Sequence, residues 1–114
     1  MNLLKQLFSS GAAVSSVEAQ EKLRGSQPPL VLDVRQPDEF RSGHIAGAKL
    51  IPLDQLSGRL NELPRDREIL CVCRSGSRSG AAARQLQAAG FNGVNLSGGM
   101  IGWQRAGLPV KQGK

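Results

Sequence analysis

The chain has 114 residues and a mass of 12.1 kDa, which suits one domain and leaves no room for a second. Hydrophobic residues (39%) and charged residues (21%) occur at ordinary globular levels, which excludes a disordered chain. Aromatic residues are 4% and Tyr is absent, which also excludes an aromatic platform for single-stranded nucleic acid. The net charge of +6 favours an anionic partner, but the arginines are scattered, and we expect no nucleic-acid partner.

The N-terminal stretch 1–13 carries the apolar side chains Leu3, Leu7 and Phe8, interrupted by Lys5. This run is too short and too mixed for a secretory signal, and no later segment reaches transmembrane length. We therefore expect no membrane partner, and we interpret residues 1–13 as a short extension that packs or binds a partner.

Strands and helices alternate through the first half of the chain. A Ser cap and early acidic residues predict a helix over 15–23, which the Pro-rich turn at 25–29 ends. The apolar run 30–34 predicts a buried strand. Pro37, two acidic residues and then Gly43 predict a short helix between them.

The second half repeats this alternation. The expected elements are a strand at 48–51, a helix at 54–63 with its leucines on one face, a strand at 68–73, a helix at 79–90, a strand at 93–96 and a last helix within 97–107. Such alternation predicts an α/β fold: a small, mostly parallel sheet of about five strands, flanked by helices on both faces, with ligands at the carboxyl ends of the strands. We expect this domain to span 14–110, with a tail at 111–114.

The two cysteines, Cys71 and Cys73, are separated by one residue. We expect them to point to opposite faces of a strand and to remain unbridged. Their spacing differs from C-x-x-C, and with His44 as the only histidine no four-ligand zinc site of Cys and His can form, so we expect no metal. Free thiols point to a reducing compartment, the cytoplasm.

The loop that follows the strand at 68–73 carries the candidate chemistry. Cys73 stands at the strand end, and small residues after it let backbone amides turn inward, next to a helix N-terminus. Such surroundings lower a thiol pKa, so Cys73 is the candidate nucleophile, whereas Cys71 is interpreted as a core residue. The candidate binding loop is Arg74, Ser75, Gly76, Ser77, Arg78 and Ser79.

Other polar residues are interpreted mainly as structural support. Asp33 and Arg35 lie at a strand end, where we expect Arg35 to pair with Asp38 or Glu39 and hold a loop. His44 is a possible general base, but a hydrogen-bonded turn histidine is the favoured interpretation.

The segment CRSGSRSGAAARQLQAAGF at 73–91 resembles the active-site loop and following helix of rhodanese-type sulfurtransferases, with their C-x-x-G-x-R-S pattern. Residues 30–52, with their Asp-Val-Arg and G-H-I-x-G-A elements, resemble the family's upstream signature, and GGMIGW at 98–103 resembles its C-terminal one. In this last element Trp103 is interpreted as a core anchor, and Gly98 and Gly99 as turn residues.

The resemblance implies that Cys73 takes a sulfur atom from a small anion such as thiosulfate as a persulfide and passes it to cyanide, a thiol or a protein thiolate. The amides of residues 74–79 would hold the persulfide. Arg78 would orient and neutralise the donor's sulfonate or orient the loop, and Arg74 would lie at the mouth. No cofactor is expected.

Two alternatives remain open. One is a sulfur carrier or protein-docking module without turnover, which would carry the same cysteine. The other is a phosphatase or arsenate reductase-like thiolate enzyme, but such loops have C-x5-R spacing. Four residues separate Cys73 from Arg78, and the loop contains no Asp to serve as an acid, so this alternative is disfavoured.

Overall fold

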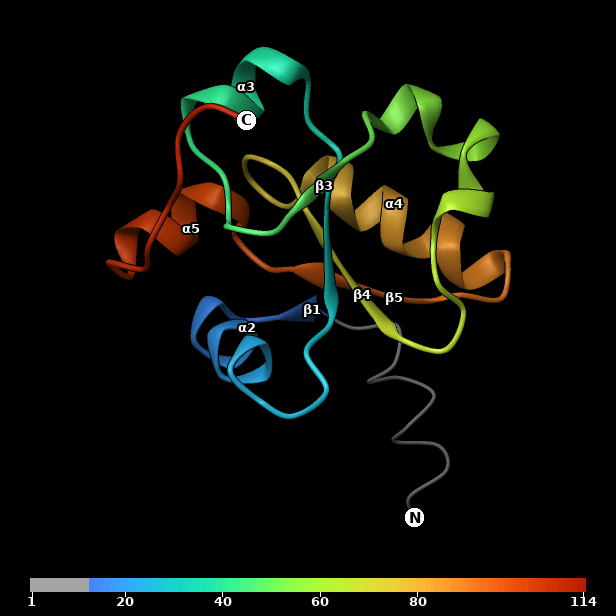
Figure 1. Cartoon of the computed structure of the whole chain (residues 1–114), viewed down its shortest axis with the longest axis horizontal. Coiled ribbons are helices and arrows are strands. Elements are labelled where there is room, and N and C mark those ends of the chain that lie inside the picture. Colours follow the sequence, from blue (N-terminus) through green and yellow to red (C-terminus); the bar gives the residue numbers. More distant parts are fainter. Residues whose placement is uncertain (1–12) are drawn as a thin grey trace.

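The computed structural model describes residues 13–114, and the apolar stripe of Leu3, Leu7 and Phe8 lies outside them. Five parallel strands form one sheet in the order β1-β5-β4-β2-β3 (Figure 1). The strands are β1 (Ala13–Val14), β2 (Leu30–Asp33), β3 (Lys49–Leu50), β4 (Glu68–Val72) and β5 (Asn92–Leu96). The two-residue strand β1 is absent from the sequence prediction, because two residues carry no recognisable alternation.

Within the described residues, four α-helices connect and cover the strands: α2 (Ser16–Leu23), α3 (Pro37–Ser42), α4 (Ser77–Ala88) and α5 (Gly99–Arg105). The predicted Ser cap of α2 is present as a reciprocal pair. The Ser15 Oγ accepts from the amide of Glu18 at 3.1 Å, and the Glu18 carboxylate accepts from the amide of Ser15 at 2.8 Å. This pair satisfies two amide groups that the first helical turn leaves without partners.

The prediction of an α-helix over 54–63 is wrong. The chain there forms two 3₁₀ segments, η1 (Leu53–Gly58) and η2 (Leu60–Glu62). Gly58 interrupts the run and weakens an α-helix by about 1 kcal/mol relative to Ala, so short 3₁₀ turns replace it. The leucine spacing still places side chains on one buried side, because Leu56 and Leu63 are buried in the core.

Helices cover both faces of the sheet, as the sequence predicts. On one face Leu32, Ile69 and Cys71 pack with residues of α4, η1 and η2. On the other face Leu70 and Val72 pack with residues of α2 and α5. The predicted α/β fold with a mostly parallel sheet of about five strands is therefore confirmed, and the five strands observed are all parallel.

Trp103 anchors α5 in the second of these layers. Its side chain is buried, and its indole N–H donates to the carbonyl of Pro109 at 2.8 Å. This contact fixes the chain that follows α5 against the body of the domain. It also satisfies the one polar group of the side chain, as a buried Trp requires.

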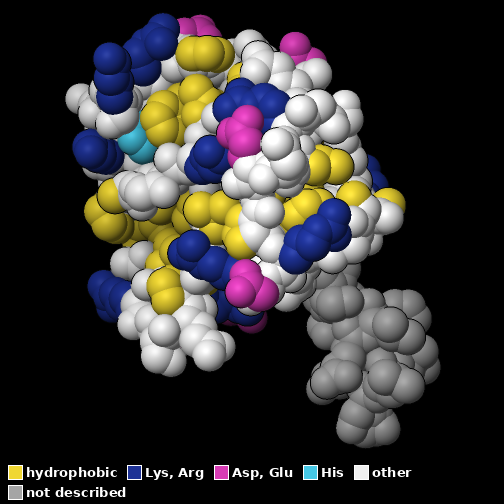
Figure 2. Space-filling view, turned by 45° about the vertical axis from the view of Figure 1, so that its right-hand side comes forward, with side chains coloured by type: hydrophobic (Ala, Val, Ile, Leu, Met, Phe, Trp, Pro, Cys, Tyr) yellow, Lys and Arg dark blue, Asp and Glu magenta, His cyan; other side chains and the backbone are white. Residues whose placement is uncertain are grey.

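Lys and Arg side chains are spread over the face drawn in Figure 2, among acidic and hydrophobic groups. Their dispersal agrees with the scattered arginines of the sequence and leaves no continuous basic stripe on that face. Within residues 13–114, no helix is long and apolar enough to cross a bilayer.

Candidate active site

Cys73 lies directly after β4, an interior strand between β2 and β5, and shortly before α4. Parallel sheets place their ligand sites at this carboxyl edge. Gly76 precedes the first turn of α4 with φ of +106°, a left-handed conformation that L side chains rarely adopt. The glycine therefore allows the loop to curl around the cysteine and to enter the helix within three residues.

The Sγ of Cys73 is almost fully buried and accepts two hydrogen bonds. One comes from the amide of Gly76 at 3.1 Å, and the other from the hydroxyl of Ser79 at 3.2 Å. Burial raises the pKa of Cys73, but hydrogen bonds from the Ser79 hydroxyl and from the amides of Ser79, Gly76 and Ser75 outweigh burial. They hold the pKa of this thiol below its ordinary value. The site therefore favours a thiolate, which is the nucleophilic form.

The environment of Cys71 differs from that of Cys73. The prediction that the two thiols point to opposite faces of the strand is nevertheless wrong. Both cysteines belong to the same core layer, because residues two apart on a strand share a face. Both are free, so the expected absence of a bridge between them agrees with the structure. Burial raises the pKa of the Cys71 thiol to about 12, which keeps it protonated and unreactive.

The Gly98-Gly99 turn brings α5 against the loop that begins at Cys73. The amide of Met100 donates to the carbonyl of Cys73 at 2.9 Å, and the amide of Ile101 donates to the carbonyl of Arg74 at 3.0 Å. Gly98 and Gly99 have φ of +81° and +57°. A Cβ on Gly99 would lie 2.5 Å from both of these carbonyl oxygens. The predicted turn role is confirmed, and the close approach adds a second reason for a glycine.

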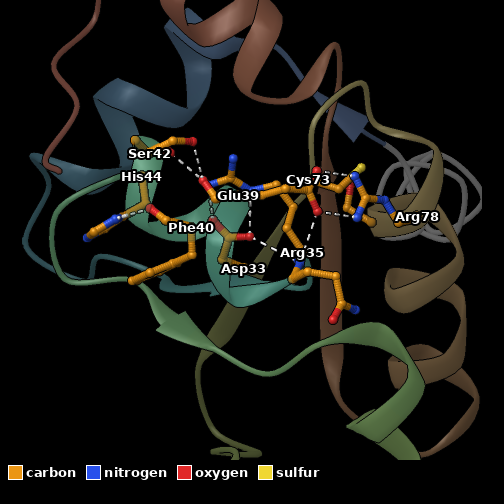
Figure 3. Close-up of polar contacts among 11 residues, drawn as sticks. Asp33, Arg35, Glu39, Phe40, Ser42, His44, Cys73 and Arg78 are labelled. Carbon is orange, nitrogen blue, oxygen red and sulfur yellow. Dashed lines mark hydrogen bonds and ion pairs between the residues drawn. The ribbon is translucent and has the colours of Figure 1, made fainter. Parts of the chain in front are cut away.

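The ion pairs around the site differ from the prediction. Arg35 pairs with neither Asp38 nor Glu39, but with Asp33 (Figure 3). Its Nε and one terminal nitrogen donate to the two carboxylate oxygens at 2.9 and 2.7 Å, and both side chains are buried. The same terminal nitrogen donates to the carbonyl of Gly43 at 2.8 Å, which ties the end of α3 to the end of β2.

Glu39 instead receives Arg78 from the candidate loop. Two guanidinium nitrogens of Arg78 donate to the two carboxylate oxygens at 2.8 and 2.9 Å (Figure 3). Hydrogen bonds from Arg78 lower the pKa of Glu39 to about 2 against the opposing effect of burial. Arg78 therefore joins α4 to α3.

The other cation of the loop, Arg74, is exposed, and it forms no ion pair within residues 13–114. It borders a groove of about 290 Å³ whose lining includes Arg35, Glu39 and Ile101. Ser75 and Ser77 are exposed as well, whereas Ser79 is buried. Arg74 is thus the loop cation with a free charge at the surface.

His44 is a buried, hydrogen-bonded histidine, as favoured by the sequence. Its Nδ1 lies 2.7 Å from the carbonyl of Phe40, and its ring stacks on the Phe40 ring at 3.6 Å. Its backbone exchanges two hydrogen bonds with Lys111. Figure 3 shows His44 well away from Cys73, so it is not positioned as a base for the thiol.

Asn95 is the site residue that the sequence analysis missed. Its Oδ1 accepts from the hydroxyl of Ser79 at 2.6 Å, and its Nδ2 donates to the carbonyl of Gly76 at 3.1 Å. The signal was a polar side chain near the carboxyl end of β5, between the buried residues Val94 and Leu96. A polar side chain on a covered sheet face needs partners, and here the partners are loop residues.

Comparison with known proteins assigns the family. The model of the rhodanese-like domain matches residues 16–106. A protein named sulfurtransferase from Allochromatium vinosum is 37% identical over 98 residues, which are 85% of this chain and 92% of that protein.

Two solved structures agree. A rhodanese-related protein from Thermoplasma volcanium has a TM-score of 0.82 and 33% identity, covering 88% of this chain and 97% of that one. A rhodanese-like domain protein from Staphylococcus aureus has a TM-score of 0.79 and 36% identity, covering 89% of this chain and 99% of that one. The chain therefore belongs to the family of rhodanese-like domains.

Proposed function

We propose that this protein is a sulfurtransferase that carries a sulfane sulfur as a persulfide on Cys73. The observation that carries the proposal is the placement of the Cys73 Sγ, which sits at a strand end and accepts from the amide of Gly76 and the hydroxyl of Ser79. These donors favour the anionic form of the sulfur. The sulfurtransferase name of the Allochromatium vinosum relative supports the same chemistry.

With thiosulfate as donor, the Cys73 thiolate attacks the outer sulfur. A bond forms between Sγ and that sulfur, the bond to the inner sulfur breaks, and its electron pair leaves with sulfite. The negative charge of the thiolate moves to the outer sulfur of the persulfide, so charge balances without a metal or other cofactor. A thiophilic acceptor such as cyanide, a thiol or a protein thiolate then attacks the outer sulfur and restores the Cys73 thiolate.

Arg74 and Arg78 take different parts in this proposal. Arg74 is exposed and borders the groove, and its free charge suits the sulfonate end of thiosulfate. The charge of Arg78 is already paired with Glu39, so Arg78 acts by orienting the loop. Asp33 and Arg35 support the same region from the end of β2.

The test is intact-protein mass spectrometry after treatment with thiosulfate, on the wild type, Cys73→Ser and Cys71→Ser. We expect the mass of one sulfur on the wild type, removed by a reductant, still present on Cys71→Ser and absent from Cys73→Ser. A labile sulfur on Cys73→Ser would refute the assignment of the nucleophile. Hydrolysis of para-nitrophenyl phosphate that depends on Cys73 would show that the protein is a phosphatase and not a sulfurtransferase.

The acceptor and the compartment complete the proposal. Two free cysteines are compatible with the reducing cytoplasm, where thiols and protein thiolates supply acceptors. An assay stopped at fixed times would compare the rates of sulfur transfer from Cys73 to cyanide, to glutathione and to a protein thiol. Slow transfer to both small acceptors with fast transfer to one protein would identify a sulfur carrier instead of a general enzyme.

A further inference from the structure

Asn95 contacts two residues that donate to Cys73, Gly76 and Ser79. It stands on β5 beside Cys71 of β4, and its carboxamide spans the first turn of α4. One end meets the hydroxyl of Ser79 and the other meets the carbonyl of Gly76. The amide of Gly76 and the hydroxyl of Ser79 both donate to the Cys73 Sγ. A change at Asn95 therefore reaches the sulfur through the Ser79 hydroxyl.

The contacts of Asn95 determine where the proton of Ser79 points. The carbonyl of Gly76 can only accept, so the Nδ2 of Asn95 must face it, at 3.1 Å. The Oδ1 of Asn95 then faces the Ser79 oxygen at 2.6 Å, and this carbonyl oxygen can only accept from the hydroxyl. The same hydroxyl lies 3.2 Å from the Cys73 Sγ. A hydroxyl has one proton, so Asn95 and Cys73 compete for it.

We propose that Asn95 is a positioning residue that controls the Ser79 hydroxyl and thereby the charge on Cys73. While Cys73 is a thiol, Ser79 donates to Asn95 and its oxygen can accept from the thiol. When Cys73 is a thiolate, the hydroxyl rotates to Sγ. In the persulfide the charge sits on the outer sulfur, and the hydroxyl returns to Asn95. This last step rests on the proposed function, whereas the competition for the proton does not.

The competition predicts the direction of the effect. Removal of the Asn95 carboxamide leaves Sγ as the remaining acceptor for the Ser79 proton among these three groups, which favours the thiolate. The carbonyl of Gly76 keeps a second partner, because it also accepts from the amide of Gly80 at 3.0 Å. A residue that merely held the loop in shape would have the opposite effect, since loosening the loop would withdraw donors from Sγ.

The experiment is the pH profile of Cys73 alkylation by iodoacetamide, which needs no sulfur donor. At a pH below the thiol pKa, we expect Asn95→Leu to react roughly two-fold to ten-fold faster than the wild type, as expected for one hydrogen bond. Asn92→Leu, an exposed position on the same strand, is the matched control and should react as the wild type does. An unchanged or slower reaction of Asn95→Leu would overturn the proposal.

Two further variants show whether the effect runs through Ser79. In a Ser79→Ala background, Asn95→Leu should leave the alkylation rate unchanged, and an equal acceleration there would overturn the proposal. Asn95→Asp keeps the size of the side chain and strengthens the competing acceptor, and its charge also opposes the thiolate directly, so it should slow alkylation more when Ser79 is present than in the Ser79→Ala background. A faster reaction of Asn95→Asp would contradict the mechanism, even if Asn95→Leu failed to fold.

The persulfide equilibrium tests the last step separately. With mixtures of thiosulfate and sulfite, Asn95→Leu should hold less persulfide than the wild type at the same ratio, by the same roughly two-fold to ten-fold. If neither protein forms a persulfide while alkylation behaves as expected, the proposed function fails and the competition for the proton stands. An unchanged persulfide fraction on a protein with altered alkylation would refute the return of the hydroxyl to Asn95.

Discussion

The guanidinium of Arg78 and the carboxylate of Glu39 face each other with two parallel hydrogen bonds of 2.8 and 2.9 Å, although they lie 39 positions apart in the chain. The pair joins the first turns of α4 and α3 beside Cys73 (Figure 3). Because each charge is matched, Arg78 offers little net charge to an anionic donor. Arg78 therefore contributes to the site by holding in position the loop that ends at Ser79.

Replacement of Glu39 by Gln should show how this pair depends on pH. Gln keeps an oxygen for the amide of Gln36, which donates to Glu39 at 3.0 Å, but loses the charge. The pair is partly exposed, so we expect a loss of about 1 kcal/mol of unfolding free energy at neutral pH. The pKa of Glu39 is about 2 in the folded state against 4.5 ordinarily, so this contribution is complete above 4.5 and disappears as the pH falls toward 2.

Urea unfolding of the wild type and Glu39→Gln at neutral pH, and again between those two pKa values, measures this dependence. The difference between the proteins should shrink in acid. A difference that grows as the pH falls would contradict a carboxylate with a lowered pKa.

Replacement of Arg74 by Ala should weaken the use of thiosulfate without affecting the fold. The side chain is exposed and has no ion pair within residues 13–114. An exposed charge contributes about 0.2–1 kcal/mol, so the thiosulfate concentration for half-maximal persulfide formation should rise roughly 1.4-fold to five-fold, and less at high salt. Arg105→Ala, an exposed arginine on α5, is the control. Equal effects of the two variants would show that only overall charge matters.

The sequence predicts the position of Cys73 in the fold better than it predicts the partners of the charged residues around it. The position of Cys73 follows from an apolar strand that ends in a Gly- and Ser-rich turn, and the structure places it there. The predicted partner of Arg35 is wrong. Asp33 and Arg35 are two residues apart at a strand end, so their side chains point to the same side of the chain and come within reach of each other. The same period of two explains the shared face of Cys71 and Cys73.

Contacts between distant segments are harder to predict from one sequence. The pairing of Glu39 with Arg78 depends on how α3 and α4 lie across the sheet edge, which no local pattern encodes. Asn95 was missed for the same reason, since its partners belong to the loop beside the neighbouring strand. The helix predicted at 54–63 failed because leucine spacing does not distinguish an α-helix from 3₁₀ turns when a glycine interrupts it.

The buried pair of Asp33 and Arg35 should matter far more than a surface pair. Arg35→Met removes one partner and leaves the Asp33 carboxylate buried without a countercharge, at a cost of about 3–5 kcal/mol. Lys22→Met removes the exposed pair with Glu68 at 3.0 Å and should cost about 1 kcal/mol or less. Thermal and urea unfolding of both variants measures the contrast. Similar losses would mean that the Asp33–Arg35 pair is not a principal support of this region.

Gly99 should tolerate no side chain. The main reason is the close approach of α5 to Cys73, and the positive φ of Gly99 is the lesser one. A Cβ there would lie 2.5 Å from the carbonyl oxygens of Cys73 and Arg74, which accept from the amides of Met100 and Ile101. Gly107 has a similar positive φ of +74°, but a Cβ there meets nothing within 4 Å. Gly107→Ala therefore reports the cost of the backbone conformation alone, about 1 kcal/mol.

We expect Gly99→Ala to cost at least about 2 kcal/mol more than Gly107→Ala in urea unfolding, because the overlap must displace the backbone at Cys73. The displaced loop would also withdraw its donors from Sγ, so alkylation of Cys73 below its pKa should slow in any Gly99→Ala protein that folds. Equal unfolding free energies for the two variants would show that the close approach of Gly99 to the loop does not constrain the site. Normal alkylation with reduced stability would separate the packing of α5 from the electrostatics of the thiolate.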